Sequence, residues 1–236
     1  IGDLRSVFAT PTTFIVALLY LAGAASVLAY FPKEGTQPQA PQATAATGDI
    51  RQQFTTAWNQ LPRTDLGIPM DGAKVLVVKF NDYECGTCKL AYDWYKPVFD
   101  KFEQSQPGVV RALSKDYPWD QSCNFNAVRT IPGHEGACNA AVAARIARDK
   151  GKFAEMEAWL FANLPTSQAS IRQRVADTLG ISDFDAEYAR RLPDVRRDIA
   201  DGGALQVQGT PTFFINGVRV PSNNLLPAEY FELAIQ

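Results

Sequence analysis

The chain begins with a long hydrophobic block, which is followed by a series of shorter ones. Residues 6–32 carry no charged side chain, and residues 14–31 are almost all apolar or small. Extended back to Phe8, this block reaches the ~20 residues that a helix needs to cross a bilayer. It predicts a single membrane-spanning anchor over residues 1–31. The alternatives are a cleaved signal peptide, because residues 22–24 resemble a cleavage site, and a buried helix at a protein interface.

The next segment, residues 32–48, is rich in Pro, Gln and Ala and has no apolar period. This composition predicts an extended linker. A short helix is expected over residues 49–61, with Asp49 as its N-cap. Its apolar face is formed by three residues spaced four apart: Ile50, Phe54 and Trp58.

Shorter apolar runs with the periods of strands and helices follow. Residues 73–80 and 109–113 predict two buried strands, and residues 89–102 predict a helix between them. Five helical segments are expected next, broken at Gly180 and Pro193: residues 137–147, 153–162, 170–179, 184–192 and 195–205. A hairpin with its turn at Asn216-Gly217 and a last helix complete the pattern: residues 212–220 and 225–235.

Strands flanked by helices, with an all-helical stretch between the second strand and the hairpin, indicate an α/β (α+β) fold. We therefore expect one domain over residues 49–236, with a helical insertion at about residues 118–205, preceded by the transmembrane helix. The chain has 236 residues, of which 46% are hydrophobic, and this supports one sizeable core. The net charge of −2, without a basic tract, excludes a nucleic-acid partner.

Two cysteines spaced as Cys85-x-x-Cys88 stand between the first predicted strand and its helix. Cys85 would lie at the first helical turn, where free N–H groups and the helix dipole favour a thiolate. A thiolate exchanges disulfides quickly, and Cys88, one turn deeper, would resolve the mixed disulfide. The alternatives are a structural disulfide or half of a zinc site. No metal and no cofactor is expected.

A second pair, Cys123 and Cys138, lies fifteen residues apart at the start of the helical insertion. The simpler interpretation is a structural disulfide that stabilises the fold by about 3 kcal/mol. The other is a second redox pair that passes electrons to or from Cys85 and Cys88. His134 precedes Cys138 by four residues, so a metal site is conceivable, but an ordinary polar residue near the helix start fits better.

Four cysteines is an even number and suits an oxidising compartment. The charges that flank residues 1–31 indicate little about which way the segment crosses the membrane, so the side on which the globular domain lies is inferred from the cysteines. We therefore expect a single-pass protein of the cell membrane, with its N-terminus in the cytoplasm and its globular domain on the periplasmic side.

Three stretches of the chain resemble the DsbA-like thiol oxidoreductases of the thioredoxin-fold superfamily. They are residues 80–88, residues 151–161 and, most specifically, residues 207–217, which contain Gly-Thr-Pro-Thr. The resemblance covers roughly residues 65–236 and leaves out the anchor and the linker. It implies a thioredoxin fold and disulfide exchange with the thiols and disulfides of protein substrates. It also implies a quinone-linked membrane partner that resets the cysteine pair.

The resemblance also assigns roles to residues around the cysteine pair. Pro211 is expected in the cis form, facing Cys85, so that Thr210 offers its backbone to an extended substrate. Gly86 and Thr87, between the cysteines, are expected to contact the substrate as well. They include no histidine, which strong oxidants of this superfamily often carry between their cysteines.

Lys79 stands where this family usually has a buried carboxylate, and with Glu84 it is expected to tune the redox pair. A charged Lys79 close to Cys85 would favour the thiolate, whereas a side chain that reaches the surface would do little. This departure also supports an alternative function. The domain would then be a binding module in an accessory subunit of a larger membrane complex.

Overall fold

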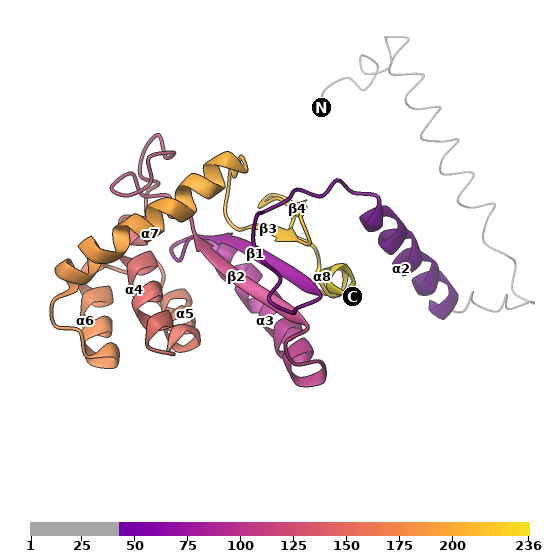
Figure 1. Cartoon of the computed structure of the whole chain (residues 1–236), viewed down its shortest axis with the longest axis horizontal. Helices are drawn as coiled ribbons and strands as arrows, with labels where there is room; N and C mark the ends of the chain where they lie inside the picture. The colour runs from indigo at the N-terminus through magenta and orange to yellow at the C-terminus, as the bar shows by residue number, and fades with distance from the viewer. Residues whose placement is uncertain (1–42) are drawn as a thin grey trace, which may run out of the picture. The chain divides into compact units, whose positions relative to one another are not determined.

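A computed structural model describes residues 43–236 of the chain (Figure 1). The predicted anchor and all of the predicted linker before residue 43 lie outside the described residues. Within residues 43–236, none of the helices combines the length and the apolar character that crossing a membrane requires. Residues 50–236 form one compact unit.

The first described helix, α2 (Ala43–Asn59), starts earlier than its sequence suggests. Asp49 was expected to cap this helix, but it lies inside it, and residues 43–48 are helical rather than an extended linker. The physical reason is that three of these six residues are alanine, the best helix former. The predicted N-cap at Asp49 is therefore wrong, and so is the extended form expected for residues 43–48.

Four strands form a single mixed sheet. They are β1 (Val75–Asn81), β2 (Val110–Asp116), β3 (Thr212–Ile215) and β4 (Val218–Val220), in the spatial order β2-β1-β3-β4. β1 and β2 run parallel, with Val75 opposite Val110, whereas the pairs β1–β3 and β3–β4 are antiparallel. This arrangement places the end of β1, which leads to the cysteine pair, beside the start of β3.

The turn between β3 and β4 is the two-residue hairpin that the sequence predicts. Asn216 and Gly217 both have positive φ angles, of 46° and 81°, as a type I′ turn requires. Asn216 also ties the turn to the neighbouring strand, since its Oδ1 accepts a hydrogen bond from the backbone N–H of Leu76 at 2.8 Å. At Gly217 a Cβ atom would lie 2.4 Å from the carbonyl oxygen of Thr64, so a larger residue does not fit.

The first four residues of β1, Val75–Val78, are all hydrophobic, because both faces of this strand are covered. Leu76, Val78 and Phe80 point into one core cluster, which they share with the helical insertion. Val75 and Val77 point into a second cluster, which they share with α3 (Gly86–Ser105) and α8 (Ala228–Ile235). Figure 1 shows α3 and α8 against the sheet and the insertion helices grouped beside it.

Four helices make up the insertion: α4 (Ala137–Asp149), α5 (Phe153–Ala162), α6 (Gln168–Leu179) and α7 (Phe184–Ala204). α4 is their centre, and all but one of its residues from Ala137 to Ala147 are buried. Its many alanines let the neighbouring helices approach closely, because a short side chain leaves the backbones little to keep them apart. α5, α6 and α7 all pack against it.

Helix α7 corrects the predicted break at Pro193. The structure has one helix over Phe184–Ala204, with Pro193 inside it, instead of two segments. Proline costs about 3 kcal/mol inside a helix because it removes one backbone hydrogen bond. Val195 and Ile199 after the proline, and Phe184 before it, are buried in the insertion-side core. Burying such side chains contributes about 1.5–3 kcal/mol each, which outweighs that cost.

A buried group of charges joins the insertion to the sheet. The guanidinium of Arg145 in α4 bridges the carboxylates of Asp116, at the end of β2, and Asp198 in α7. Lys115 bonds the same Asp198 at 3.1 Å. These contacts hold the chain where it leaves β2, and the next residues pass close to the cysteine pair.

Candidate active site

The Cys85-x-x-Cys88 motif lies where β1 ends and α3 begins. Cys85 is the N-cap of α3, with extended backbone angles (φ −87°, ψ 119°), and Cys88 lies in the first turn. Both are free thiols; Cys85 is half-buried, and Cys88 is completely buried. The tight turn of residues 82–84 thus presents one sulfur to solvent and keeps the other beneath it. Gly86 and Thr87, between them, are exposed.

The two thiols have opposite acidities. The pKa of Cys85 is lowered to about 6, chiefly by a hydrogen bond from the Cys88 thiol, with further help from Thr210 and the Cys88 backbone, while burial opposes the shift. The pKa of Cys88 is raised well above its usual value, because burial penalises its thiolate and because its thiol donates a hydrogen bond to Cys85. At neutral pH, Cys85 is therefore mostly a thiolate and Cys88 a thiol.

The Gly-Thr-Pro-Thr segment lies against the exposed cysteine. The peptide bond between Thr210 and Pro211 is cis, the form that the resemblance implies. When protonated, the Cys85 thiol donates a hydrogen bond to the carbonyl oxygen of Thr210 at 3.3 Å. Trp119, which follows β2, holds this segment from the side, because its indole Nε1 donates to the Thr210 hydroxyl at 3.1 Å.

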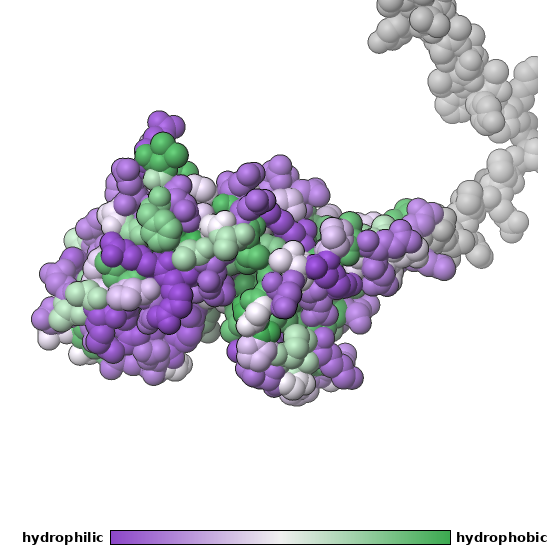
Figure 2. Space-filling view, turned by 45° about the horizontal axis from the view of Figure 1, so that its top comes forward, coloured by the Kyte–Doolittle hydropathy of each residue, from purple (hydrophilic) through white to green (hydrophobic). Residues whose placement is uncertain are grey.

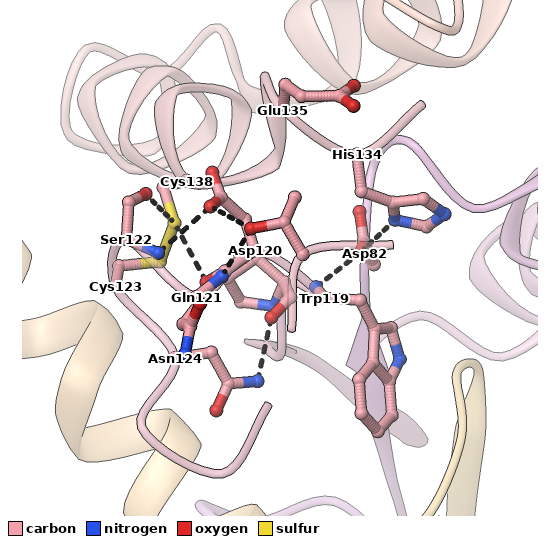
Figure 3. Close-up of a disulfide and its surroundings, with 12 residues drawn as sticks. Asp82, Trp119, Asp120, Gln121, Ser122, Cys123, Asn124, His134, Glu135 and Cys138 are labelled. Atoms are coloured by element: carbon pink, nitrogen blue, oxygen red, sulfur yellow. Dashed lines mark hydrogen bonds and ion pairs between the residues drawn. A yellow bond between two sulfur atoms is a disulfide. The ribbon is translucent and has the colours of Figure 1, made fainter. Parts of the chain in front are cut away.

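A buried carboxylate, Asp82, underlies the motif. Its Oδ1 accepts the backbone N–H of Glu84 at 2.8 Å, and its Oδ2 accepts that of Trp119 at 2.7 Å. His134, from the loop between β2 and α4, places Nδ1 2.7 Å from the same Oδ2 (Figure 3). The hydrogen bond to Asp82 and the negative charge of this carboxylate raise the pKa of His134 above the usual range. His134 is thus part of the candidate site, not the ordinary polar residue expected from the sequence.

Glu84 is a second buried acid at the site. Its Oε2 accepts the backbone N–H of Thr166 at 2.7 Å, but its Oε1 has no hydrogen-bond partner. Burial is the main reason why the pKa of this carboxyl is raised to about 7. Gly136 makes room for it, since a Cβ there would lie 2.4 Å from the Thr166 carbonyl oxygen and 3.3 Å from Glu84 Oε1.

Lys79 adopts neither of the two arrangements considered from the sequence. Its ammonium is paired with Glu157 of α5 at 3.2 Å, and the side chains of both residues are largely buried. The ammonium also lies 5.5 Å from the centre of the Phe161 ring. Lys79 is therefore mostly shielded from solvent, and the adjacent carboxylate of Glu157 compensates its charge. The two residues line a cavity of about 300 Å³ between β1, β2, α3 and α5.

The second cysteine pair forms a disulfide. The sulfurs of Cys123 and Cys138 are bonded at 2.02 Å, and the bond joins the loop after β2 to the first turn of α4 (Figure 3). Both residues are buried. Within residues 43–236, no cluster of three or more His, Cys, Asp or Glu side chains is arranged to hold a metal ion.

Three contributors to this arrangement were not recognised as site residues from the sequence: Asp82, Trp119 and His134. Asp82 lies within residues 80–88, one of the three stretches that carry the family resemblance, but its burial depends on the loop that closes over it. Trp119 and His134 come from the insertion, 37 and 52 residues from Asp82 along the chain. The signal that could have found His134 is that it is the only histidine of the chain.

Comparison with known proteins places the chain among thioredoxin-like proteins. Residues 64–235 match the family model described as Thioredoxin. Among solved structures, a thioredoxin-like oxidoreductase from Silicibacter pomeroyi DSS-3 aligns with a TM-score of 0.52 at 24% identity, over 72% of this chain and 92% of that one. The α-DsbA1 protein of Wolbachia pipientis aligns with a TM-score of 0.53 at 15% identity, over 70% and 85%. At these identities the likeness concerns the fold.

The curated relatives are named as sodium/proton antiporters. NhaA 1 of Salinispora arenicola (strain CNS-205) is 34% identical over 179 residues, which cover 66% of this chain and 24% of that protein. NhaA 1 of Mycobacterium sp. (strain KMS) is 30% identical over 153 residues, which cover 62% and 22%. The chain thus spans less than a quarter of the length of these relatives. Since the family model accounts for residues 64–235, the chain belongs to the thioredoxin family.

Proposed function

We propose that this protein is a membrane-anchored, extracytoplasmic thiol–disulfide oxidoreductase that exchanges disulfides with protein substrates through Cys85 and Cys88. One observation carries the proposal. Cys85 is half-exposed at the N-terminus of α3, has a pKa of about 6, and lies 3.3 Å from the backbone of Thr210. Disulfide exchange with an extended chain needs a thiolate beside backbone groups that the chain can pair with, and Thr210 supplies such groups next to Cys85.

The two cysteines take different parts in the reaction. In the reducing direction, the Cys85 thiolate attacks one sulfur of a substrate disulfide, and the other substrate sulfur leaves as a thiolate. Cys88 then loses its proton and attacks Cys85, which forms the Cys85–Cys88 disulfide and releases the second substrate sulfur. Two electrons pass to the substrate. The oxidising direction is the reverse of these steps, and the burial of Cys88 keeps it from attacking substrates directly.

Protein substrates are favoured by the surface beside the cysteines. The loop between Trp119 and His134 projects above α4 and α7 in Figure 1, and Figure 2 shows hydrophobic residues just below the hydrophilic tip of this projection. Its exposed apolar residues are Phe125, Val128 and Ile131. Because both ends of the loop contact site residues, an unfolded chain that extends from Thr210 along the loop would meet these side chains as well.

The test compares the protein with its Cys85→Ser and Cys88→Ser variants. The expected result is that the wild type reduces insulin in a dithiol buffer and oxidises a dithiol peptide, whereas Cys85→Ser does neither. Cys88→Ser should instead accumulate a mixed disulfide with the substrate, because the resolving thiol is missing. Unchanged turnover by Cys85→Ser would reject the proposal.

The proposed location depends on two parts of the chain. The Cys123–Cys138 disulfide supports an oxidising compartment, because such bonds are rare in the cytosol. Residues 1–31 supply the proposed single-pass anchor. The quinone-linked partner that would reset Cys85 and Cys88 is proposed from the resemblance alone. Cell fractionation tests the location: the 236-residue chain should stay with membranes after a carbonate wash and be cleaved by protease added to spheroplasts.

A second candidate function is a thioredoxin-like module within a larger membrane protein or complex. It is favoured by the curated relatives, which are named as antiporters and of which the chain spans less than a quarter. In this case the partner would be a membrane transport protein. Co-purification with a membrane protein at fixed stoichiometry, kept when Cys85 and Cys88 are both changed to Ala, would support the module. Loss of the association in that variant would count against it.

A further inference from the structure

The pairing of His134 with Asp82 joins the helical insertion to the cysteine pair. His134 Nδ1 lies 2.7 Å from Asp82 Oδ2, and the Asp82 side chain is completely buried. Asp82 is three residues before Cys85, whose backbone N–H donates to the Asp82 carbonyl oxygen at 3.3 Å. The imidazole and the carboxylate are therefore bonded to each other, and a single backbone turn separates them from the thiol at the start of α3.

We propose that His134 is a positioning residue for disulfide exchange: held against Asp82 as an imidazolium, it supplies the counter-charge that lets the Cys85 thiolate form beside a buried carboxylate. The proposal rests on the function proposed above and adds a residue from the insertion to it. His134 forms no bond to the substrate and acts only through Asp82.

The need for a counter-charge follows from the burial of the carboxylate. Two negative charges close together in a poorly solvated site oppose each other, and the charge of Asp82 does raise the pKa of Cys85. The two backbone N–H groups that Asp82 accepts stabilise its charge but leave the net charge negative. A His134 imidazolium bonded to Oδ2 brings the net charge of the Asp82–His134 pair to zero.

The groups that face His134 are all acidic. Asp82 bonds it directly, and the charges of Cys85 and Glu84 also raise its pKa. Glu135, the neighbour in the same loop, is exposed, and in Figure 3 no hydrogen bond or ion pair joins its side chain to His134 or Asp82. Lys79, the cation on β1, is already paired with Glu157. The positive charge of the site therefore comes from His134 in the insertion. It comes neither from Lys79 on β1 nor from the residues between the cysteines, Gly86 and Thr87.

The proposal makes the charge of His134 depend on the redox state of the cysteine pair. When the dithiol site reduces a substrate disulfide, Cys85 and Cys88 become one disulfide and two electrons leave. The thiolate charge leaves with one substrate sulfur, and the Cys88 proton passes to the other. His134 then still contacts the Asp82 carboxylate, but the negative charge at Cys85 is gone. Because coupling is reciprocal, the pKa of His134 must be lower in the oxidised protein than in the reduced one.

Nuclear magnetic resonance tests this coupling directly, because His134 is the only histidine of the chain and its ring signals are unambiguous. The signals are followed against pH in the reduced protein, the oxidised protein and reduced Cys85→Ser. We expect a lower pKa of His134 in the last two samples than in the first. The same pKa in all three would overturn the proposal, and this experiment needs no substitution of the histidine.

Variants test the effect on the thiolate. His134→Gln removes the charge, and we expect the pKa of Cys85 to rise from about 6 by about one unit, so that the thiolate fraction at pH 6 falls about fivefold. His134→Lys, which restores a cation, should recover most of the thiolate. Glu135→Gln is the matched control and should change nothing. Thiolate absorbance is the readout. An unchanged fraction in His134→Gln, or an equal fall in Glu135→Gln, would refute the role.

These readouts are independent of turnover. If the wild type shows the coupled titration but never exchanges a substrate disulfide, the proposed function fails while the role of His134 in stabilising the thiolate stands. If the wild type turns over substrates while His134 titrates identically in both redox states, only the role of His134 fails.

Discussion

Replacing Cys88 by Ala should change how the reactivity of Cys85 depends on pH. The Cys88 thiol is the largest influence that lowers the pKa of Cys85 to about 6, and the backbone and Thr210 contributions remain in the variant. We therefore expect the pKa to rise by about two units, to about 8. At pH 5.5 the thiolate fraction would then fall about 75-fold.

A thiolate of higher pKa is also a better nucleophile, and this partly offsets the smaller fraction. With a Brønsted coefficient of about 0.45, two units make each thiolate about eightfold more reactive. The variant should therefore be alkylated about tenfold more slowly than the wild type at pH 5.5, at about the same rate at pH 7, and about sevenfold faster at pH 9. The two rate–pH curves should cross near neutral pH.

The assay is alkylation by iodoacetamide of the protein reduced just enough to open the Cys85–Cys88 pair. Mass spectrometry should find one label on Cys85 in both proteins, because Cys88 is buried in the wild type and Cys123 and Cys138 are bonded to each other. Two parallel curves with the same midpoint would show that Cys88 does not stabilise the thiolate. The reasoning about this site would then be wrong.

Three further predictions concern the surroundings of the cysteines. Because the pKa of Glu84 is raised to about 7, the folded protein keeps a proton that the unfolded chain releases from about pH 4.5. This carboxyl therefore makes the free energy of unfolding fall as pH rises towards and through 7. Glu84→Gln should therefore stabilise the protein by about 2 kcal/mol at pH 8 and much less at pH 4.5 in urea titrations; equal effects at both pH values would contradict this. Val128→Asp should raise the KM for reduced, unfolded protein substrates several-fold and leave exchange with glutathione unchanged, since Val128 is exposed on the projecting loop; equal effects on both substrates would exclude a docking role. Changing Cys123 and Cys138 together to Ala should lower the free energy of unfolding by about 3 kcal/mol, measured by denaturant titration, and a loss of disulfide exchange in a variant that stays folded would favour the redox interpretation of this pair.

Most of the fold could be predicted from the chain itself, because local patterns decide it. The apolar run of β1, the periodic apolar face of α3 and the Asn216-Gly217 turn are each properties of consecutive residues, and the structure contains all three elements. The predictions that were wrong, the N-cap at Asp49 and the break at Pro193, also used local signals. At Pro193 the burial of Phe184, Val195 and Ile199 in the core that α7 shares with the rest of the insertion outweighed a local preference.

The cysteine chemistry was equally visible in the sequence, since two residues of spacing between Cys85 and Cys88 place both sulfurs at the start of one helix. What surrounds that pair was decided only by the tertiary structure. The insertion brings Trp119 to Thr210 and His134 to Asp82, and it pairs Lys79 with Glu157. Such contacts depend on how helices far apart in the chain pack against the sheet. The electrostatic surroundings of the Cys85 sulfur therefore come from the folded core, whereas the position of that sulfur at a helix start comes from neighbouring residues.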